Sequence, residues 1–220
     1  MQSALIHQVK ILFLKELRSE FRNRFAINGI LLQLVSSIYI VYLSFKFISP
    51  NIWSALFWII LLFTTVSGIS RSFVQERQGR MLYFHTTVNP LAVLYAKIAF
   101  NTLLGLMITA IALLFFTLFM GAPDLNFLWF SALALLFALG LSILLTFLSA
   151  LAAKTKAGGV IMPVLSFPLV LPLILIAISS GSMLTAGETE NLWRNLLLLG
   201  LLDAMLAALA IVLFRFLWQE

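Results

Sequence analysis

Residues that could perform chemistry are scarce in this chain. Its two histidines, His7 and His85, are too few for a histidine-rich metal site, and the absence of cysteine excludes thiolate ligands and disulfides. Either histidine could be an axial haem ligand, although a partly solvated surface histidine is the commoner case. No Gly-x4-Gly-Lys-Ser/Thr loop occurs, so the chain is not expected to bind ATP in the P-loop manner. An ATPase that drives this protein would be a separate subunit.

Two ionisable residues lie inside long apolar segments. Asp203 is midway along residues 194–214, and Lys97 is a few residues into 91–120. A charge at the centre of a membrane helix costs about 2.5–3.5 kcal/mol on insertion scales, which makes such residues functional candidates. Lys97 is expected to extend its ammonium to the nearer membrane surface. Asp203 could face a polar cavity, pair across a subunit contact, or sit protonated; because it stands alone, a structural role is favoured.

The composition identifies the elements that must position these residues. Of the 220 residues 62% are hydrophobic and 10% are charged, and the mean hydropathy is +1.09, whereas about a quarter of an ordinary soluble domain is charged. A helix needs about 20 apolar residues to cross a hydrocarbon core of ~30 Å. The sequence therefore predicts one all-α, polytopic membrane domain. Its six expected spans cover residues 25–47, 52–70, 91–120, 127–153, 159–180 and 194–214.

Residues 1–24 form a basic arm with apolar residues at helical spacing and charged residues between them. The apolar positions are Leu5, Val9, Leu12, Phe13, Leu17 and Phe21. This pattern predicts an amphipathic helix in the membrane interface, with its cationic face toward anionic lipid headgroups. The alternative is a charged tail that only orients the first span.

The net charge of +6 follows membrane sidedness, so no nucleic-acid partner is expected. Twelve of the fourteen Lys and Arg residues lie on the side of the N-terminus, which places both termini and the 71–90 loop in the cytoplasm. Trp53, Trp129 and Trp193 lie near the expected outer boundaries and Trp218 near the inner one, as in an aromatic belt.

Residues 71–90, RSFVQERQGRMLYFHTTVNP, are the longest polar interruption after the arm. They predict a short helix across the membrane face that inserts into a groove on a soluble partner. The alternative is a helix that contacts only lipid. The residues expected at the partner interface are Glu76, Arg77, Gly79, Arg80, Met81, Leu82, Tyr83 and Phe84.

The fifth span contains the sequence GGVIMPVLSFPLVLP. Each interior proline removes a backbone hydrogen bond, and such breaks survive in a membrane where neighbouring helices or a cavity satisfy the freed carbonyls. A kinked helix packed inside the bundle or its oligomer is expected. It is either a flexible element at a translocation or lateral-access surface, or a static kink. The residues concerned are Gly158, Gly159, Pro163, Pro168 and Pro172.

The order of these features resembles the B subunit of the cytochrome c maturation system, the haem exporter protein B (CcmB) family. The resemblance covers essentially the whole chain. It is most specific in residues 156–177, where a cation, paired glycines and spaced prolines recur. The second most specific part is the loop that ends at Asn89-Pro90 and is followed by Ala96-Lys97. It implies a fold similar to ABC-2-type exporters, with an N-terminal elbow helix and a coupling helix between spans two and three that contacts the ATPase.

The same resemblance implies the partners. They are an ABC ATPase subunit, a haem-handling membrane subunit, a haem chaperone on the outer side, and a second copy of the chain, all at the bacterial inner membrane. ATP hydrolysis by the ATPase would serve haem handling or release of the haem-loaded chaperone. The family pattern gives no role to Asp203. No tryptophan-rich haem-binding motif occurs, so no cofactor is expected to bind this chain, which would itself be non-catalytic.

Three other functions remain open from the sequence. The chain could be the membrane subunit of another ABC-2-type exporter, for lipid, glycan or drug, or a non-transporting membrane scaffold. A secondary transporter would need Asp203 for coupling.

Overall fold

The computed structural model describes residues 2–22, 24–45, 47–70, 89–121, 126–154 and 158–219. Within these ranges the chain forms α-helices and no strands, which confirms the all-α prediction. The helices are α1 (Gln2–Arg22), α2 (Arg24–Ser44), α3 (Pro50–Ile69), α5 (Pro90–Met120), α6 (Phe127–Lys154), α7 (Gly158–Thr185) and α8 (Leu192–Gln219).

Six of these helices are long and apolar enough to cross a membrane, so the chain is a multi-pass membrane protein. Their apolar segments lie close to the expected spans, and the largest differences are at the two ends of the fifth, which is expected over residues 159–180. The segments are Ile27–Ser44, Pro50–Ile69, Pro90–Met120, Phe127–Ala153, Leu165–Thr185 and Leu192–Phe214.

Local signals explain where several helices begin and end. Both α3 and α5 start at a proline, whose missing N–H is not needed in the first turn of a helix. The side chain of Asn89 accepts a hydrogen bond from the backbone N–H of Leu91 at 3.0 Å and so caps α5. At the other end of α5, Gly121 has φ +76, a conformation that glycine adopts without strain.

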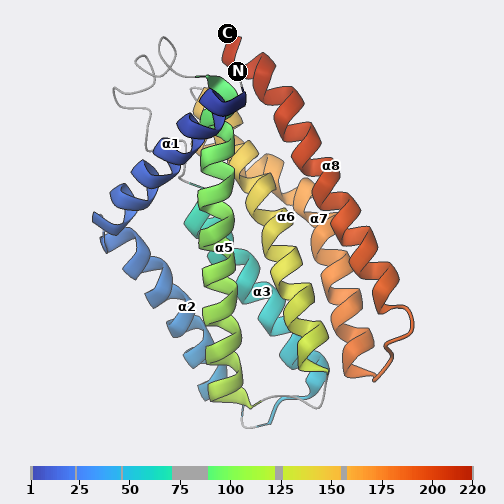
Figure 1. Cartoon of the computed structure of the whole chain (residues 1–220). Helices are drawn as coiled ribbons and strands as arrows, with labels where there is room; N and C mark the ends of the chain where they lie inside the picture. Colours follow the sequence, from blue (N-terminus) through green and yellow to red (C-terminus); the bar gives the residue numbers. More distant parts are fainter. Residues whose placement is uncertain are drawn as a thin grey trace.

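The helix α6 is the centre of the bundle (Figure 1). Every residue from 140 to 150 is buried, and α6 packs against α3, α5, α7 and α8. The helix α2 lies outside this ring, against α3 and α5, and α1 crosses α5 near the end of the bundle where both termini lie. The common end for the termini agrees with the prediction that they share one side of the membrane.

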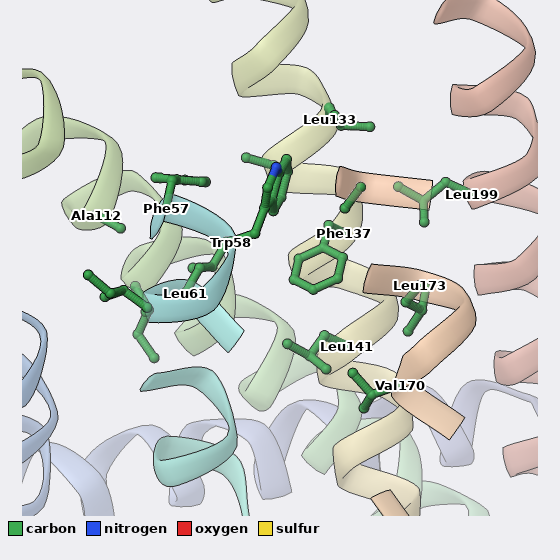
Figure 2. Close-up of a cluster of buried hydrophobic side chains, with 14 of the residues drawn as sticks. Phe57, Trp58, Leu61, Ala112, Leu133, Phe137, Leu141, Val170, Leu173 and Leu199 are labelled. Carbon is green, nitrogen blue, oxygen red and sulfur yellow. The ribbon is translucent and has the colours of Figure 1, made fainter. Parts of the chain in front are cut away.

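Aromatic side chains form a cluster in the core, and Figure 2 shows part of it, with Phe57 and Trp58 of α3 and Phe137 of α6. Trp53 stacks on Phe57 with ring centroids 5.8 Å apart, and Phe116 and Phe130 meet its ring edge-on. Trp53 is 2% exposed, so its predicted place in a lipid-facing belt is wrong. Its height along the helix fits the belt, but it lies on the face of α3 that turns toward α5 and α6. Trp193, at the start of α8, is exposed as expected.

The proline-rich segment is assigned to one helix, α7, which runs from Gly158 to Thr185 across all three prolines. Pro168 and Pro172 are exposed, whereas Val170 and Leu173 between and beside them are buried against the core. Within the single chain these two prolines therefore face away from the bundle. That an oligomer covers this face, and that the helix flexes there, stay predictions.

Candidate functional site

The interface residues predicted between Glu76 and Phe84 lie outside the described residues, as does His85. The two flanks of that loop are described: Ser70 follows α3, and Asn89 precedes α5. The contacts of these flanking helices show how the loop is attached to the rest of the bundle.

The helix after the loop is joined to α6 by buried polar groups, which we call the α5–α6 seam: Asn101 and Gly105 of α5, and Ser142 and Thr146 of α6. The Asn101 amide donates to the Thr146 hydroxyl at 2.9 Å, and this hydroxyl donates to the carbonyl of Ser142 at 2.6 Å. Gly105 lies directly on the Ser142 hydroxyl, where a Cβ would have no room. Small residues and interhelical hydrogen bonds of this kind are what join helices within a membrane.

The helix before the loop is joined to the same element. The hydroxyl of Ser149, one turn beyond Thr146 on α6, donates to the backbone carbonyl of Ser70 at 3.1 Å. Both helices that flank the loop are thus hydrogen-bonded to α6 within two turns of each other. Sequence reasoning did not single out Ser142, Thr146 and Ser149, although their spacing of four and three residues places them on one helix face.

Lys97 lies one turn before the seam on α5. It is 2% exposed, and its Nζ is 3.5 Å from Glu16 Oε2 of α1. Lys15 also contacts Glu16, at 3.4 Å. The expectation that Lys97 extends to the membrane surface is wrong, because α1 covers the ammonium and brings it an acidic partner.

The arm α1 packs its apolar face on the bundle. Leu12 is buried in a cluster with Val93 of α5, Ala150 of α6 and Phe214 of α8. On the same helix, burial raises the pKa of Glu20 above its ordinary 4.5, the nearby Glu16 raises it further, and Lys97 opposes the shift. The predicted amphipathic helix is present, and part of its apolar face covers protein.

The outward side of α1 carries three cations beside two exposed apolar residues. They surround an open depression of about 640 Å³ whose described lining is Ile11, Leu14, Lys15, Arg18, Ser19 and Arg22. This combination suits the headgroup and upper chain of an anionic lipid, in line with the interfacial role expected for the arm.

Asp203 lies where α6, α7 and α8 meet. It is 4% exposed, and neither carboxylate oxygen has a hydrogen-bond partner. The carboxylate lies against the backbone of Gly140, and a Cβ added to Gly140 would overlap Oδ1 of Asp203. The side chain of Leu173 lies next to the same position. Within the described residues Asp203 therefore has no intrachain hydrogen-bond partner. The glycine that makes room for it was not foreseen.

In the described parts of the chain, no three His, Cys, Asp or Glu residues are grouped so that they could hold a metal ion. His7 is exposed on α1. The polar groups that the structure brings together are thus suited to joining helices, and nothing in their arrangement resembles a hydrolytic site.

Comparison with known protein families identifies the family of the chain. The family model of the CcmB protein matches residues 7–216, nearly the whole chain. No match was found among the curated proteins. The chain therefore belongs to the CcmB family, and as a multi-pass membrane protein it is a membrane component of the ABC-type haem-export system for cytochrome c maturation.

Proposed function

We propose that this chain is the non-catalytic membrane subunit through which a separate ATPase acts on haem handling or on the release of a haem-loaded chaperone. The observation that supports this most directly is the pair of hydrogen bonds that join the elements on both sides of the 71–90 loop to α6, at Ser70 directly before the loop and at Asn101 about three turns into α5. A push on the loop would displace α3 and α5, and both contact the helix at the centre of the bundle.

The ATPase would meet the polar loop at Glu76 and Arg77, the glycine that follows, and the apolar and aromatic residues up to Phe84. The sequence contains no P-loop, so ATP is hydrolysed on the partner. Because ABC ATPases work as a pair, two copies of this chain are required. No haem or other cofactor is held by the chain itself.

The remaining partners follow from the family. A haem-handling membrane subunit binds within the bilayer, and a haem chaperone acts at the outer side. The bias of Lys and Arg supports termini and a loop on the cytoplasmic side. Membership of the CcmB family supports a location in the bacterial inner membrane.

The test is co-purification from native membranes in mild detergent, followed by peptide identification. Wild type is compared with a Glu76→Ala/Arg77→Ala variant and with a matched Glu188→Ala/Glu190→Ala variant, whose exposed acids lie between α7 and α8. Wild type and the matched variant are expected to retain the ATPase and a haem-handling protein, and the loop variant is expected to lose the ATPase.

Three outcomes would contradict the proposal. Retention of the ATPase by the loop variant would show that the ATPase binds another part of the chain. Recovery of the ATPase with a lipid or glycan enzyme would favour another ABC-2-type exporter. If wild type brings down no ATPase, the chain does not work in the proposed way, and Asp203 becomes the first residue to study as a coupling site.

A further inference from the structure

The charged side chains of α1 are sorted between two sides of the helix. Glu16 faces α5, where its Oε2 lies 3.5 Å from Lys97 Nζ. Burial raises the pKa of Glu20, and the charges that also act on this pKa are those of Glu16 and Lys97, so Glu20 belongs to the same side. Arg18 and Arg22 are exposed, and among the described residues no carboxylate pairs with either. These two arginines therefore leave positive charge on the outward side of α1.

The open depression on this outward side combines positive charge with apolar surface. Its volume of about 640 Å³ lies within the ~300–1,000 Å³ of ordinary ligand sites. Its lining residues follow each other at steps of one, three and four positions, so they lie along one side of the helix. The apolar residues are at one end of the lining and most of the cations at the other. The described lining is Ile11, Leu14, Lys15, Arg18, Ser19 and Arg22.

The inner end of α3 marks the limit of the hydrocarbon core. Its apolar segment, Pro50–Ile69, has 20 residues, about the number that crosses a core of ~30 Å. The carbonyl of Ser70, the next residue, accepts a hydrogen bond from Ser149 of α6. Ser149 lies one turn beyond the α5–α6 seam on α6, and Lys97 lies one turn before it on α5. Because α5 and α6 run in opposite directions (Figure 1), Lys97 is level with the end of α3.

The depression lies at this same level. Glu16 contacts Lys97, and Lys15, the neighbour of Glu16, belongs to the lining. At the other end of the lining, Arg22 comes five residues before Ile27, where the apolar segment of α2 begins. The headgroup layers lie directly outside the hydrocarbon core and extend the bilayer to about 40–45 Å. The cations of the depression are therefore at the depth of the lipid phosphates.

We infer that this depression is a discrete binding site for one anionic phospholipid, whose phosphate is held by Lys15, Arg18 and Arg22. A guanidinium presents paired N–H donors to phosphate oxygens, and the Ser19 hydroxyl adds another donor. The site differs from a general attraction between a basic helix and an anionic surface, because a hollow with a fixed lining retains one molecule when bulk lipid is removed. Since Lys15 also contacts Glu16, the bound phosphate is linked to the pairing of α1 with α5.

An acidic surface of a soluble protein suits the depression less well than a lipid does. Ile11 is 53% exposed and Leu14 is 40% exposed beside the cations. A phospholipid carries apolar and anionic parts in one molecule and is already present at this depth. An acidic protein surface would have to enter the headgroup layer and leave these apolar side chains without an apolar partner.

The test is lipid binding to the full chain, purified in mild detergent together with its co-purifying subunits. Fluorescent phosphatidylglycerol is titrated into the protein, and phosphatidylcholine with the same label is the comparison. Wild type is measured beside Arg18→Gln/Arg22→Gln and beside a control with the same loss of charge, Lys10→Gln/Arg194→Gln. The two control residues are exposed, and neither belongs to the described lining.

Wild type is expected to bind phosphatidylglycerol more tightly than phosphatidylcholine. The Arg18→Gln/Arg22→Gln variant should weaken phosphatidylglycerol binding by roughly 25-fold, since each cation near an anionic membrane surface contributes about fivefold. The control variant should bind like wild type. Equal affinity of wild type for the two lipids, or equal affinity of all three proteins for phosphatidylglycerol, would overturn the inference.

Thermal unfolding distinguishes a lipid from a free anion. Phosphatidylglycerol is expected to raise the thermal midpoint of wild type and of the control variant, but not that of Arg18→Gln/Arg22→Gln. A rise of the same size with inorganic phosphate would assign the depression to a small anion and overturn the lipid site.

The inference does not depend on the coupling proposed above. Phosphatidylglycerol binding by samples that contain no ATPase would keep the site and reject the coupling. Conversely, the Arg18→Gln/Arg22→Gln variant is also tested for co-purification of the ATPase. Loss of the ATPase with phosphatidylglycerol binding unchanged would show that these cations bind the ATPase, and would overturn the lipid site.

Discussion

The helix α6 uses polar chemistry differently on two of its sides. Toward α5, Thr146 accepts a hydrogen bond from Asn101, and the hydroxyls of Thr146 and Ser142 donate to carbonyls of their own helix. One turn before Asn101, Lys97 pairs with Glu16. Toward α8, Asp203 lies on Gly140, and neither of its oxygens has a hydrogen-bond partner in the part of the chain that the structure describes. One side is a set of satisfied pairs, and the other is a single polar group in an apolar contact.

This difference shows which contacts of α6 are specific. Hydrogen bonds between buried groups favour one arrangement of the two helices, because sliding would leave donors and acceptors unpaired. Where Asp203 meets Gly140, the contact of α8 with α6 depends on shape, because a carboxylate seated on a glycine is limited by space. We therefore expect α5 and α6 to move together.

The largest expected effect comes from filling the space that Asp203 occupies. Gly140→Ala puts a Cβ on the carboxylate, and such overpacking is expected to destabilise the bundle by about 1–3 kcal/mol. Thermal unfolding in detergent, followed by size-exclusion chromatography, measures the change. Gly200→Ala on α8 is the control, because a Cβ there meets nothing within 4 Å. Adding Asp203→Ala to Gly140→Ala should restore much of the loss, and a double variant no better than the single one would contradict the contact.

The seam is tested by a double-mutant cycle. Asn101→Leu and Thr146→Val each remove one partner of the interhelical hydrogen bond, and each is expected to cost about 1–2 kcal/mol. The combined variant should lose less than the sum of the two, by roughly 0.6 kcal/mol, the usual size of such couplings in membrane bundles. Strict additivity in the measured unfolding free energies would mean that this hydrogen bond does not join the helices.

A smaller change is expected when Asp203 loses only its capacity for charge. Asp203→Asn keeps the shape and should leave stability and cytochrome c maturation near wild type, because among the described residues the carboxylate has no hydrogen-bond partner to lose. Thermal midpoint and maturation in cells are the two measurements. If maturation fails while the fold is intact, the acid itself is needed, and the contact is more than a matter of shape.

The smallest effect concerns the charges beyond the seam. Burial is the main cause that raises the pKa of Glu20 in the folded protein. The protonated side chain of Glu20 therefore contributes to the stability of the folded state at low pH. That contribution is lost as the pH rises from the ordinary 4.5 through the raised folded value. Glu20→Gln should therefore gain thermal stability relative to wild type between pH 4 and 7. Parallel midpoints across this range would show that Glu20 is not desolvated.

The six spans could be predicted because length and hydropathy decide whether a segment crosses the bilayer. The same signals do not say which side of a helix faces its neighbours. For this reason Trp53 was placed at the lipid boundary, and Lys97 was expected to reach the membrane surface although Glu16 lies 81 positions earlier. Asp203 stood out as a charge in an apolar segment, whereas its neighbour Gly140 looked like any other small residue in a membrane helix.

The ion pair between Glu16 and Lys97 also sets an order for biosynthesis. Glu16 leaves the ribosome long before Lys97 is made, and Lys97 begins the third segment to enter the bilayer. The helix α1 therefore finds this ionic partner only after the two apolar segments between them, Ile27–Ser44 and Pro50–Ile69, have been made. An interrupted chain that stops after these two crossings would display α1 without this attachment.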